Sequence, residues 1–408
     1  MIAQLRSKIV QSKNEFVFER AGIVMRLIYL MSMICAFCVA NIYYSQPILM
    51  ILAKSFGVTQ AQIGNIPTIV QLSYAVGLLF LVPLGDKVNR KRLLQILLFI
   101  NLIASFIIAI SESFLLLEVL NFFIGITSIG AQIIIPAAPS YVDKKNRGKA
   151  IGILLSGLVT GILVARLLSG YIGEIWGWRA VFFVASFIDI GSILFISFNF
   201  PANKGNNQLN YKILIKSTCS LFLHEKELRR SCLSGFLIFG AYSALWGSVA
   251  YLTSSAPFFL TSHEVGLLGL SGIAGIIVAP YIGRIADAYT PGFVVAVGGV
   301  ISLLGFFVMY FSVWSIMVVL TFMILLDVSA RHSVIGNQLR VFSLNESARS
   351  RLNTAFMTAY FLGGALGTKA GSILGELYGW DGLVLLGSIA SVVTIILNRK
   401  DFLSMHKR

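Results

Sequence analysis

Three ionisable side chains fall within the stretch "LLDVSARHSV", residues 325–334, inside one of the most apolar regions of the chain. On a helix, Asp327 and Arg331 share one face at i, i+4 spacing and can pair, whereas His332 points about 140° away from Asp327. Charged groups inside a membrane span are costly and usually functional. Asp327 is therefore the first candidate for a proton site, and a permanent structural pair with Arg331 is the alternative.

The composition places that stretch in a membrane. The chain is 57% hydrophobic and 12% charged, whereas about a quarter of the residues of a soluble protein are charged. Twelve segments reach the roughly 20 apolar residues that a spanning helix needs, and strand-like alternation is absent, so we expect an all-α integral membrane protein. The predicted spans are 26–48, 62–84, 93–111, 114–138, 150–173, 179–199, 231–253, 265–285, 292–311, 315–338, 351–374 and 381–397.

The basic residues give an orientation. The formal charge of +15 comes from short bursts of Lys and Arg between the apolar segments, which argues against a nucleic-acid partner. Only Lys54 and Arg179 fall on one side of the expected membrane, while Arg166, Arg331 and Lys369 lie within spans. By the positive-inside rule both termini are expected in the cytoplasm of a multi-pass protein of a bacterial-type inner membrane.

The longest loop divides the spans into six plus six. Lys212 and Lys216 lie four apart in it among apolar residues, which is typical of a helix on the inner membrane surface, with a solvated linker as the alternative. The expected organisation is a cytoplasmic tail 1–25, an N-terminal half 26–199, a central loop 200–230, a C-terminal half 231–397 and a cytoplasmic tail 398–408.

An internal repeat relates the two halves. "NRGKAIGILLSGLVTGILVARLLSGYIGEIWGWRAVFFVAS" (146–186) matches "ARSRLNTAFMTAYFLGGALGTKAGSILGELYGWDGLVLLGS" (348–388) at a constant offset of 202 residues. The matched pairs include Arg147/Arg349, Gly161/Gly363, Glu174/Glu376 and Gly177/Gly379. Two six-helix halves in the same orientation, related about the membrane normal, are the arrangement of one large class of transporters.

A charged turn follows the second predicted span, in "GLLFLVPLGDKVNRKRLL", residues 77–94. Asp86 heads it and Asn89 can take the left-handed conformation that a tight turn needs. A partial echo, "GRIADAYTP", places Asp287 four residues after Gly283. The basic residues of the turn are Lys87, Arg90, Lys91 and Arg92.

This turn, the twelve spans and the repeat together resemble the major facilitator superfamily over nearly all of 24–397. Its loop signature is G-x-x-x-D-[RK]-x-G-[RK]-[RK], from which Val82 and Asn89 depart. The stretches "NIYYSQPIL" and "RSRLNTAFMTAYFLGGALG" look closest to bacterial arabinose-efflux-like and drug–proton antiporter permeases, although Arg166 departs from the antiporter pattern. The resemblance implies proton-driven export of a small molecule by alternating access.

The resemblance also implies a conformational latch. Asp86 would face the N-terminus of the span that begins near Arg349, and Asp287 the one that begins near Arg147. An anion aligned with a helix N-terminus gains roughly 0.3–1 kcal/mol. The expected latch residues are Asp86, Lys87, Arg90, Lys91, Asp287, Arg147 and Arg349.

The span 150–173 carries a buried arginine. Gly157 and Gly161 form a small-xxx-small face for close helix contact, and Arg166 points well away from it. Asp189 lies at a similar depth in the next span and could pair with Arg166. A structural ion pair and a substrate-binding arginine both remain open.

Polar side chains also follow the four spans 26–48, 114–138, 231–253 and 315–338, which the resemblance implies line the central cavity. Glu118 joins Asp327 and Arg331 as a proton-coupling candidate. For the aromatic residues among the cavity candidates, packing in the core is the alternative. Lys369 is expected to snorkel to the surface. The substrate-cavity candidates are Asn41, Tyr44, Asn121, Gln132, Arg166, Tyr242, Trp246 and Gln338.

No Walker A loop, GxSxG elbow or HExxH motif occurs, so we expect no enzyme activity and no cofactor or metal. The four cysteines are too few and too scattered for a disulfide framework. The expected partners are a small-molecule substrate, protons and the lipid bilayer, and the protein is expected to be a monomer. The alternatives are an importer or facilitator on the same fold and a membrane sensor that does not transport.

Overall fold

The computed structural model describes residues 25–138, 141–143, 146–201, 210–311, 315–345 and 348–403. Within these ranges the backbone forms helices and turns and no strand. Most of both expected tails and residues 202–209 of the central loop lie outside the described residues. So do the side chains of Asp86 and Asp287, although their backbone is described.

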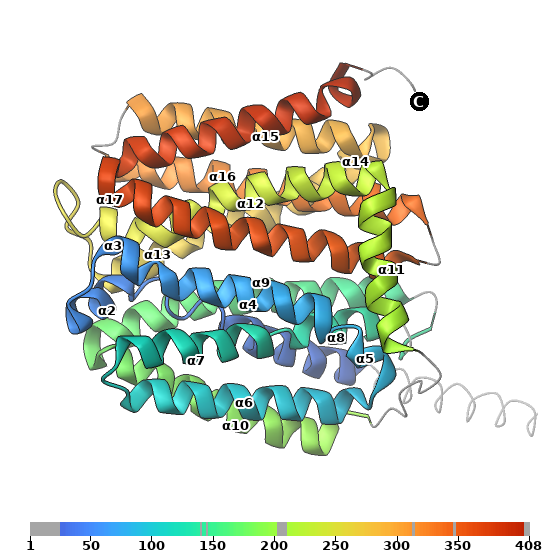
Figure 1. The fold of residues 1–408 in the computed structure, drawn as a ribbon, viewed down its shortest axis with the longest axis horizontal. Coiled ribbons are helices and arrows are strands. Elements are labelled where there is room, and N and C mark those ends of the chain that lie inside the picture. The colour runs from blue at the N-terminus through green and yellow to red at the C-terminus, as the bar shows by residue number, and fades with distance from the viewer. Residues whose placement is uncertain are drawn as a thin grey trace, which may run out of the picture.

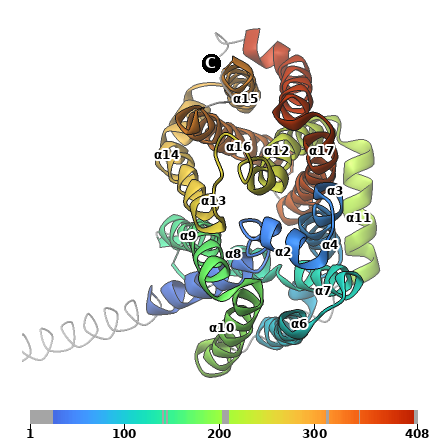
Figure 2. The ribbon, with the colours of Figure 1, turned by 90° about the vertical axis from the view of Figure 1, so that its left-hand side faces the viewer.

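The helices run side by side in two groups, which Figure 1 shows above and below one another and Figure 2 shows end on. The lower group holds Met25–Ala40, α2 (Leu49–Phe56), α3 (Gln60–Ile63), α4 (Asn65–Phe80), α5 (Leu84–Lys87), α6 (Arg90–Ile110), α7 (Phe114–Thr127), α8 (Gly130–Ala137), α9 (Arg147–Trp176) and α10 (Trp178–Asn199). The upper group holds α12 (Lys226–Leu252), α13 (Ser262–Leu268), η3 (Gly269–Ser271), α14 (Gly272–Ala288), α15 (Pro291–Phe311), α16 (Ile316–Leu344) and α17 (Arg349–Leu403).

Ten helices among the described residues are long and apolar enough to cross a membrane. One of them, α17, contains two predicted spans. Gly379 lies between these two spans and has a non-helical backbone, with φ 58° and ψ −136°. Gly177, the equivalent residue, has φ 80° at the turn between α9 and α10. Glycine reaches this left-handed region without the steric cost that other residues meet. With the shorter apolar helix Met25–Ala40, the two-half helical fold expected from the sequence is confirmed.

The first predicted span, 26–48, is wrong as a single helix. The helix Met25–Ala40 ends, residues 41–48 form consecutive turns, and α2 then begins at Leu49. Pro47 disfavours a helix through residues 43–46, since proline lacks the N–H that continues a helix, clashes with the carbonyl four residues earlier and restricts the residue before it. Residues 41–46 are therefore presented by turns rather than by a regular helix face.

The signature turn differs from the prediction at Asn89. Its backbone is extended, with φ −64° and ψ 111°, and its side-chain oxygen accepts a hydrogen bond from the Arg92 N–H. Asn89 is thus the N-cap of α6 and not a left-handed turn residue, because capping satisfies a backbone donor that the first helical turn leaves unpaired.

The small residues of α9 and α17 allow close helix packing. A Cβ on Gly161 would clash with the Ala36 carbonyl oxygen, and one on Gly363 would clash with that of Phe236. Any side chain at either position would force two backbones apart. The predicted close contact of the glycine face is confirmed, and it recurs at equivalent positions of the two halves.

The predicted surface segment is a helix, α11 (Tyr211–His224), which lies across one end of the bundle (Figure 1). The Tyr211 hydroxyl donates to the Phe80 carbonyl at 2.6 Å, and burial raises the pKa of this hydroxyl. Arg351 of α17 donates to the Ser217 hydroxyl at 3.1 Å, so α11 contacts both halves. We call this end, with α5 and the beginning of α17, the terminal face, and the end with α2, α3 and α13 the far face.

Candidate functional site

A hydrogen-bonded chain joins the two halves deep in the bundle. The Arg166 NH1 group donates to the Tyr242 hydroxyl at 3.3 Å, and that hydroxyl donates to Oδ1 of Asp327 at 3.0 Å. Each of these residues lies well inside its helix, several turns from both ends. At 1.5 Å per residue, that depth is close to the middle of a hydrocarbon layer about 30 Å thick.

Aromatic rings enclose the Arg166 guanidinium. Its central carbon lies 3.5 Å from the centroid of the Trp246 ring and 5.0 Å from that of Tyr43. Tyr242 stacks on Phe239 with ring centroids 5.9 Å apart. A cation over an aromatic face gains about 2 kcal/mol when water is excluded, and Arg166 is only 1% exposed. The rings therefore help a charge to remain in a site that water does not reach.

Two ion pairs that the sequence allows are not formed among the described side chains. Arg166 does not pair with Asp189: its Nε donates to the Gln46 side chain at 3.0 Å, and Asp189 accepts from Asn41 at 3.2 Å instead. Likewise, the Asp327 carboxylate accepts from the hydroxyls of Tyr242 and Ser271, and among the described side chains no ion pair within 4 Å joins it to Arg331. Matching depth along two helices does not fix the direction in which side chains point.

Sequence reasoning missed three residues that complete this chain, namely Tyr43, Gln46 and Ser271. The first two lie in the turns that precede Pro47, and Ser271 ends the short helix η3. Helical periodicity cannot place residues in irregular backbone. Pro47, inside an apolar run, was the signal that could have indicated this irregularity.

The prediction for His332 is confirmed. A Cβ on Gly298 of α15 would lie 2.8 Å from the His332 Cβ, so this side chain packs against a neighbouring helix. Its Nδ1 lies 2.9 Å from the Val328 carbonyl oxygen, one turn earlier in the same helix. His332 is therefore apart from the chain that contains Asp327.

Other cavity candidates make contacts within their own half. Asn121 donates to the Leu117 carbonyl of its own helix at 2.8 Å, and Gln338 donates to Asn353 at 3.2 Å. Tyr44 is buried, and Gln132 lines a small cleft at the terminal face. Within the described hydrogen bonds, none of these candidates contacts the chain from Arg166 to Asp327.

Glu118 and Lys369 belong to the far face. Asn65 donates to Oε1 of Glu118 at 2.7 Å and accepts from the Lys369 ammonium at 2.6 Å. Lys369 also donates to the Ala61 carbonyl at 2.8 Å. Lys369 thus lies toward the surface, as expected, and its ammonium group donates there to two acceptors in the other half. The described hydrogen bond of Glu118 joins it to this network and not to Asp327.

The predicted latch residues lie at the terminal face. Lys91 donates to the Ser197 carbonyl at 2.7 Å, Arg90 to that of Gly85 at 3.1 Å, and Arg349 to that of Phe342 at 3.1 Å. Arg147 begins α9, and Lys87 ends α5. Each of the three hydrogen bonds joins groups of one half.

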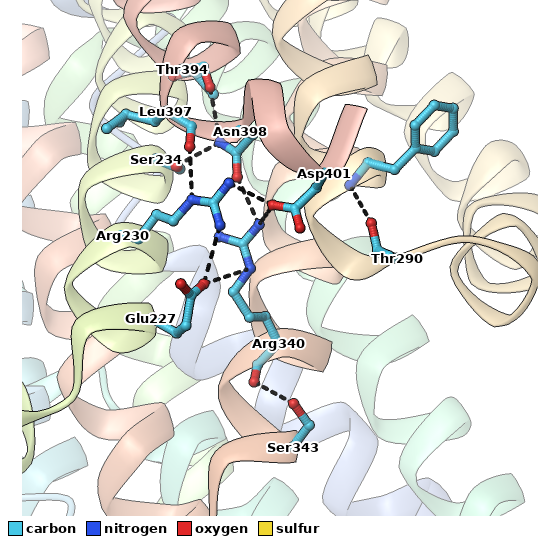
Figure 3. Close-up of polar contacts among 11 residues, drawn as sticks. Glu227, Arg230, Ser234, Thr290, Arg340, Ser343, Thr394, Leu397, Asn398 and Asp401 are labelled. Carbon is cyan, nitrogen blue, oxygen red and sulfur yellow. Dashed lines mark hydrogen bonds and ion pairs between the residues drawn. The ribbon is translucent and has the colours of Figure 1, made fainter. Parts of the chain in front are cut away.

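A second charged cluster, absent from the sequence predictions, ties the upper group together at the terminal face (Figure 3). Arg340 of α16 lies 3.7 Å from Glu227 of α12 and 3.6 Å from Asp401 of α17. It also donates to Asn398 at 2.7 Å, and Arg230 lies 2.5 Å from Asp401. The cluster joins three helices of one half, which favours motion of that half as one body.

The two ends of the bundle differ in how tightly the halves meet. At the far face, a Cβ on Gly64 would clash with the Ser372 hydroxyl, and one on Gly170 would lie 2.5 Å from the Ser262 carbonyl oxygen. Toward the terminal face, Gly148 and Gly152 of α9 and Gly283 of α14 make no such contact with the other half. A small cleft there is lined by Leu78, Val82, Gln132 and Pro136 of one half and Ser350, Asn353, Thr354 and Met357 of the other.

The arrangement therefore places an ionisable carboxyl group and a buried cation at the contact between the two halves. The carboxyl group of Asp327 can take up a proton, and Arg166 has an NH2 group without an acceptor among the described atoms. Within the described residues, no group of three or more His, Cys, Asp or Glu comes together that could hold a metal ion.

Comparison with known proteins places this geometry among transporters. Residues 29–330 match the model of the Major Facilitator Superfamily. The chain is 35% identical to the uncharacterized transporter YgaY of Escherichia coli O157:H7, over 92% of this chain and 95% of that protein. It is 23% identical to the inner membrane transport protein YnfM of Escherichia coli K12, over 90% and 88% respectively.

Two solved structures share the fold. The nucleoside transporter NupG superposes with a TM-score of 0.71 at 16% identity, over 95% of this chain and 99% of that chain. A bacterial homolog to the human lysosomal transporter Spinster, inward-facing and unoccupied, gives a TM-score of 0.74 at 15% identity, over 94% and 97%. At such low identity, the likeness concerns the fold alone.

Proposed function

Because the chain belongs to the major facilitator superfamily, we propose that it is a secondary active transporter that exports a small organic molecule in exchange for protons. The observation that carries the proposal is the chain from Arg166 through Tyr242 to Asp327. It connects an ionisable carboxyl group to a buried cation across the two halves. Outward direction is supported by the sequence likeness to efflux permeases at "NIYYSQPIL" and "RSRLNTAFMTAYFLGGALG".

In this proposal the halves 26–199 and 231–397 rock against each other around the central chain. In this proposal, the close contacts at the far face and the small cleft at the terminal face belong to a state that is closed toward the far face. Rigid motion of the C-terminal half is supported by the cluster around Arg340, which holds α12, α16 and α17 together.

Asp327 is the proposed proton site. A carboxyl group that is 3% exposed keeps its charge only with hydrogen-bond donors or a nearby cation. Tyr242 and Ser271 supply the donors, and Arg166 lies one hydroxyl away. Movement of the halves that separates Arg166 from Tyr242 takes the cation away from Asp327 and would favour the protonated form. Arg331 and Glu118 remain secondary candidates.

The proposed substrate position is beside Arg166, Tyr242 and Trp246. The aromatic faces and the NH2 group of Arg166, which has no acceptor among the described atoms, suit a molecule that has both an apolar part and a hydrogen-bond acceptor. Gln132 borders the cleft of the terminal face. The predicted cavity residues that are proposed to line the transport path through the bundle are Asn41, Tyr44, Asn121, Gln132 and Gln338.

The terminal face is proposed to lie in the cytoplasm of a bacterial inner membrane. The distribution of Lys and Arg supports this orientation, and the likeness to YnfM, an inner membrane transport protein, supports the membrane. Asp86 and Asp287, with the basic residues around them, are the proposed latch of the same face. The protein is proposed to act as a monomer.

Flux measurements in proteoliposomes test the function. Purified protein is reconstituted, a pH gradient of either sign is imposed, and flux is measured across a panel of metabolites and drugs. Antiport predicts that an acid exterior expels preloaded substrate from vesicles, whereas symport predicts the opposite sign. Binding without any flux would favour the sensor alternative and would overturn the proposal.

A further inference from the structure

Two carboxylates of the far face reach from one half to the other. Glu376 of α17 accepts a hydrogen bond from the Ala61 backbone N–H at 2.6 Å. Glu174 of α9 accepts one from the Ser262 backbone N–H at 3.0 Å. The two glutamates are equivalent in the sequence repeat, 202 residues apart. The same kind of contact is therefore made twice, once from each half to the other.

The groups that the glutamates bind are helix N-termini. Gln60–Phe80 is a span that begins with α3, and Ser262–Ala286 is one that begins with α13. The first backbone N–H groups of a helix have no partner within it, and the positive end of the helix dipole attracts anions. Glu376 and Glu174 thus supply both a hydrogen-bond acceptor and a negative charge.

Both helices already use a capping box, which leaves a defined position for the glutamates. Thr59 and Gln62 form the box of α3, and Thr261 and Glu264 form that of α13. These residues are again 202 apart. The boxes satisfy the N-cap and third N–H groups, so the N–H groups of Ala61 and Ser262 are among those that remain for a partner in the other half.

A strip of contacts connects each glutamate to the middle of the bundle. On α9 the strip runs from Glu174 through Gly170, which meets Ser262 and Gly266, to Arg166. Residues spaced by four lie on one face of a helix. The far-face contact and the central cation therefore belong to one helix surface, against α13 and η3.

The equivalent strip on α17 has the same form. It runs from Glu376 through Ser372, which meets Gly64, to Thr368. Thr368 accepts a hydrogen bond from Gln71 of the other half at 2.9 Å. Lys369 adds two hydrogen bonds to the N-terminal half at this seam, to the Ala61 carbonyl and the Asn65 side chain.

We propose that Glu174 and Glu376 form a far-face latch that holds the molecule closed on this side and releases when the far face opens. Each carboxylate neutralises a helix N-terminus of the other half, and separation of the halves breaks both contacts together. The inference rests on the alternating access of the proposed function. It assigns a role to two residues on the face opposite to Asp86 and Asp287.

Site-directed labelling tests the far-face latch without a substrate. The background is Cys219→Ser, because Cys219 is the exposed cysteine whereas Cys35, Cys38 and Cys232 are buried. Ser248→Cys reports on the far face: Ser248 is fully buried, and its hydroxyl lies 3.2 Å from the position of a Cβ on Gly375. Ser350→Cys, in the terminal cleft, reports on the opposite face.

Labelling by a maleimide is measured on the full chain in lipid nanodiscs, where both faces are accessible. Glu174→Gln and Glu376→Gln keep the side-chain size but remove the charge. Loss of an anion at a helix N-terminus is expected to speed labelling of Ser248→Cys about two- to fivefold for each change, and about tenfold for the double change. Labelling of Ser350→Cys is expected to slow, because opening one face closes the other.

Glu112→Gln is the matched control, since Glu112 is exposed in the loop between α6 and α7 at the same face. The proposal is overturned if the double change labels Ser248→Cys no faster than the control does. It is equally overturned if labelling rises at both reporters, because that pattern means general loosening. Labelling that shifts as expected in a protein without flux would contradict the proposed function and leave the far-face latch intact.

Discussion

Removal of a single hydroxyl group, in Tyr242→Phe, separates Arg166 from Asp327. The ring, with its stacking on Phe239, is retained, so the change is confined to two hydrogen bonds of 3.3 and 3.0 Å. A hydrogen bond to a charged group contributes about 1.5–3 kcal/mol. Arg166 and Tyr242 belong to different halves. The free energy of the hydrogen bond between them therefore favours the conformation in which the two halves are in contact at these residues.

A loss of that size changes the ratio of two conformations about 10- to 100-fold, since about 1.4 kcal/mol corresponds to a factor of ten. We expect Tyr242→Phe to reduce flux driven by a pH gradient by that factor. The measurement is initial flux in proteoliposomes for the panel compound that the unmodified protein carries fastest. Exchange without a gradient is measured in parallel, because it requires conformational change but no net proton movement.

Tyr281→Phe is the control for this prediction. Tyr281 is 59% exposed on α14, away from the chain, and loss of its hydroxyl is expected to change flux by less than about twofold, since exposed positions contribute little. If Tyr242→Phe keeps more than half of the gradient-driven flux at equal protein content, the hydroxyl does not couple Arg166 to Asp327 and the reasoning is refuted.

Four further changes test separate parts of the account. Asp327→Asn is expected to abolish gradient-driven flux while exchange without a gradient persists, and equal loss of both would remove Asp327 from proton coupling. Arg340→Met removes contacts to Glu227, Asp401 and Asn398. It should lower the free energy of unfolding by about 1–3 kcal/mol in denaturant titrations, and an unchanged value would contradict a stabilising role of the cluster. Gly161→Val places a side chain against the Ala36 backbone and should cost about 1–3 kcal/mol of stability by the same measurement, whereas unchanged stability would contradict the close packing. Asp86→Asn is expected to fold, as judged by monodisperse purification, and to lose transport; normal export by this variant would remove the latch role of Asp86.

The fold was largely predictable because its signals are local. Long apolar runs fix the spans, and the match between 146–186 and 348–388 fixes the relation between the halves. Gly177 and Gly379 could be paired from sequence, and both adopt the left-handed backbone that glycine favours. The break at 41–48 was missed because hydropathy does not register a turn inside an apolar run.

The sequence indicated how deep in the membrane the site residues lie, but not which side chains they contact. Arg166, Tyr242 and Asp327 were each identified, yet the sequence suggested only Asp189 as a possible partner of Arg166 and did not indicate the contact with Tyr242. Helical spacing gives the face of a residue on its own helix, whereas rotation of one helix against another depends on packing across the whole bundle. Residues far apart in sequence, such as those of the cluster around Arg340, come together through the same packing and carry no pairing signal in a single sequence.

Proton coupling through Asp327 is tested by flux in proteoliposomes under an imposed pH gradient, measured for the unmodified protein and for Asp327→Asn side by side. Proton exchange at Asp327 predicts that preloaded substrate leaves vesicles faster when the exterior is acidic, and that this acceleration disappears in Asp327→Asn. Flux that is indifferent to the gradient in the unmodified protein, or that keeps its gradient dependence in Asp327→Asn, would contradict proton-coupled transport through this site.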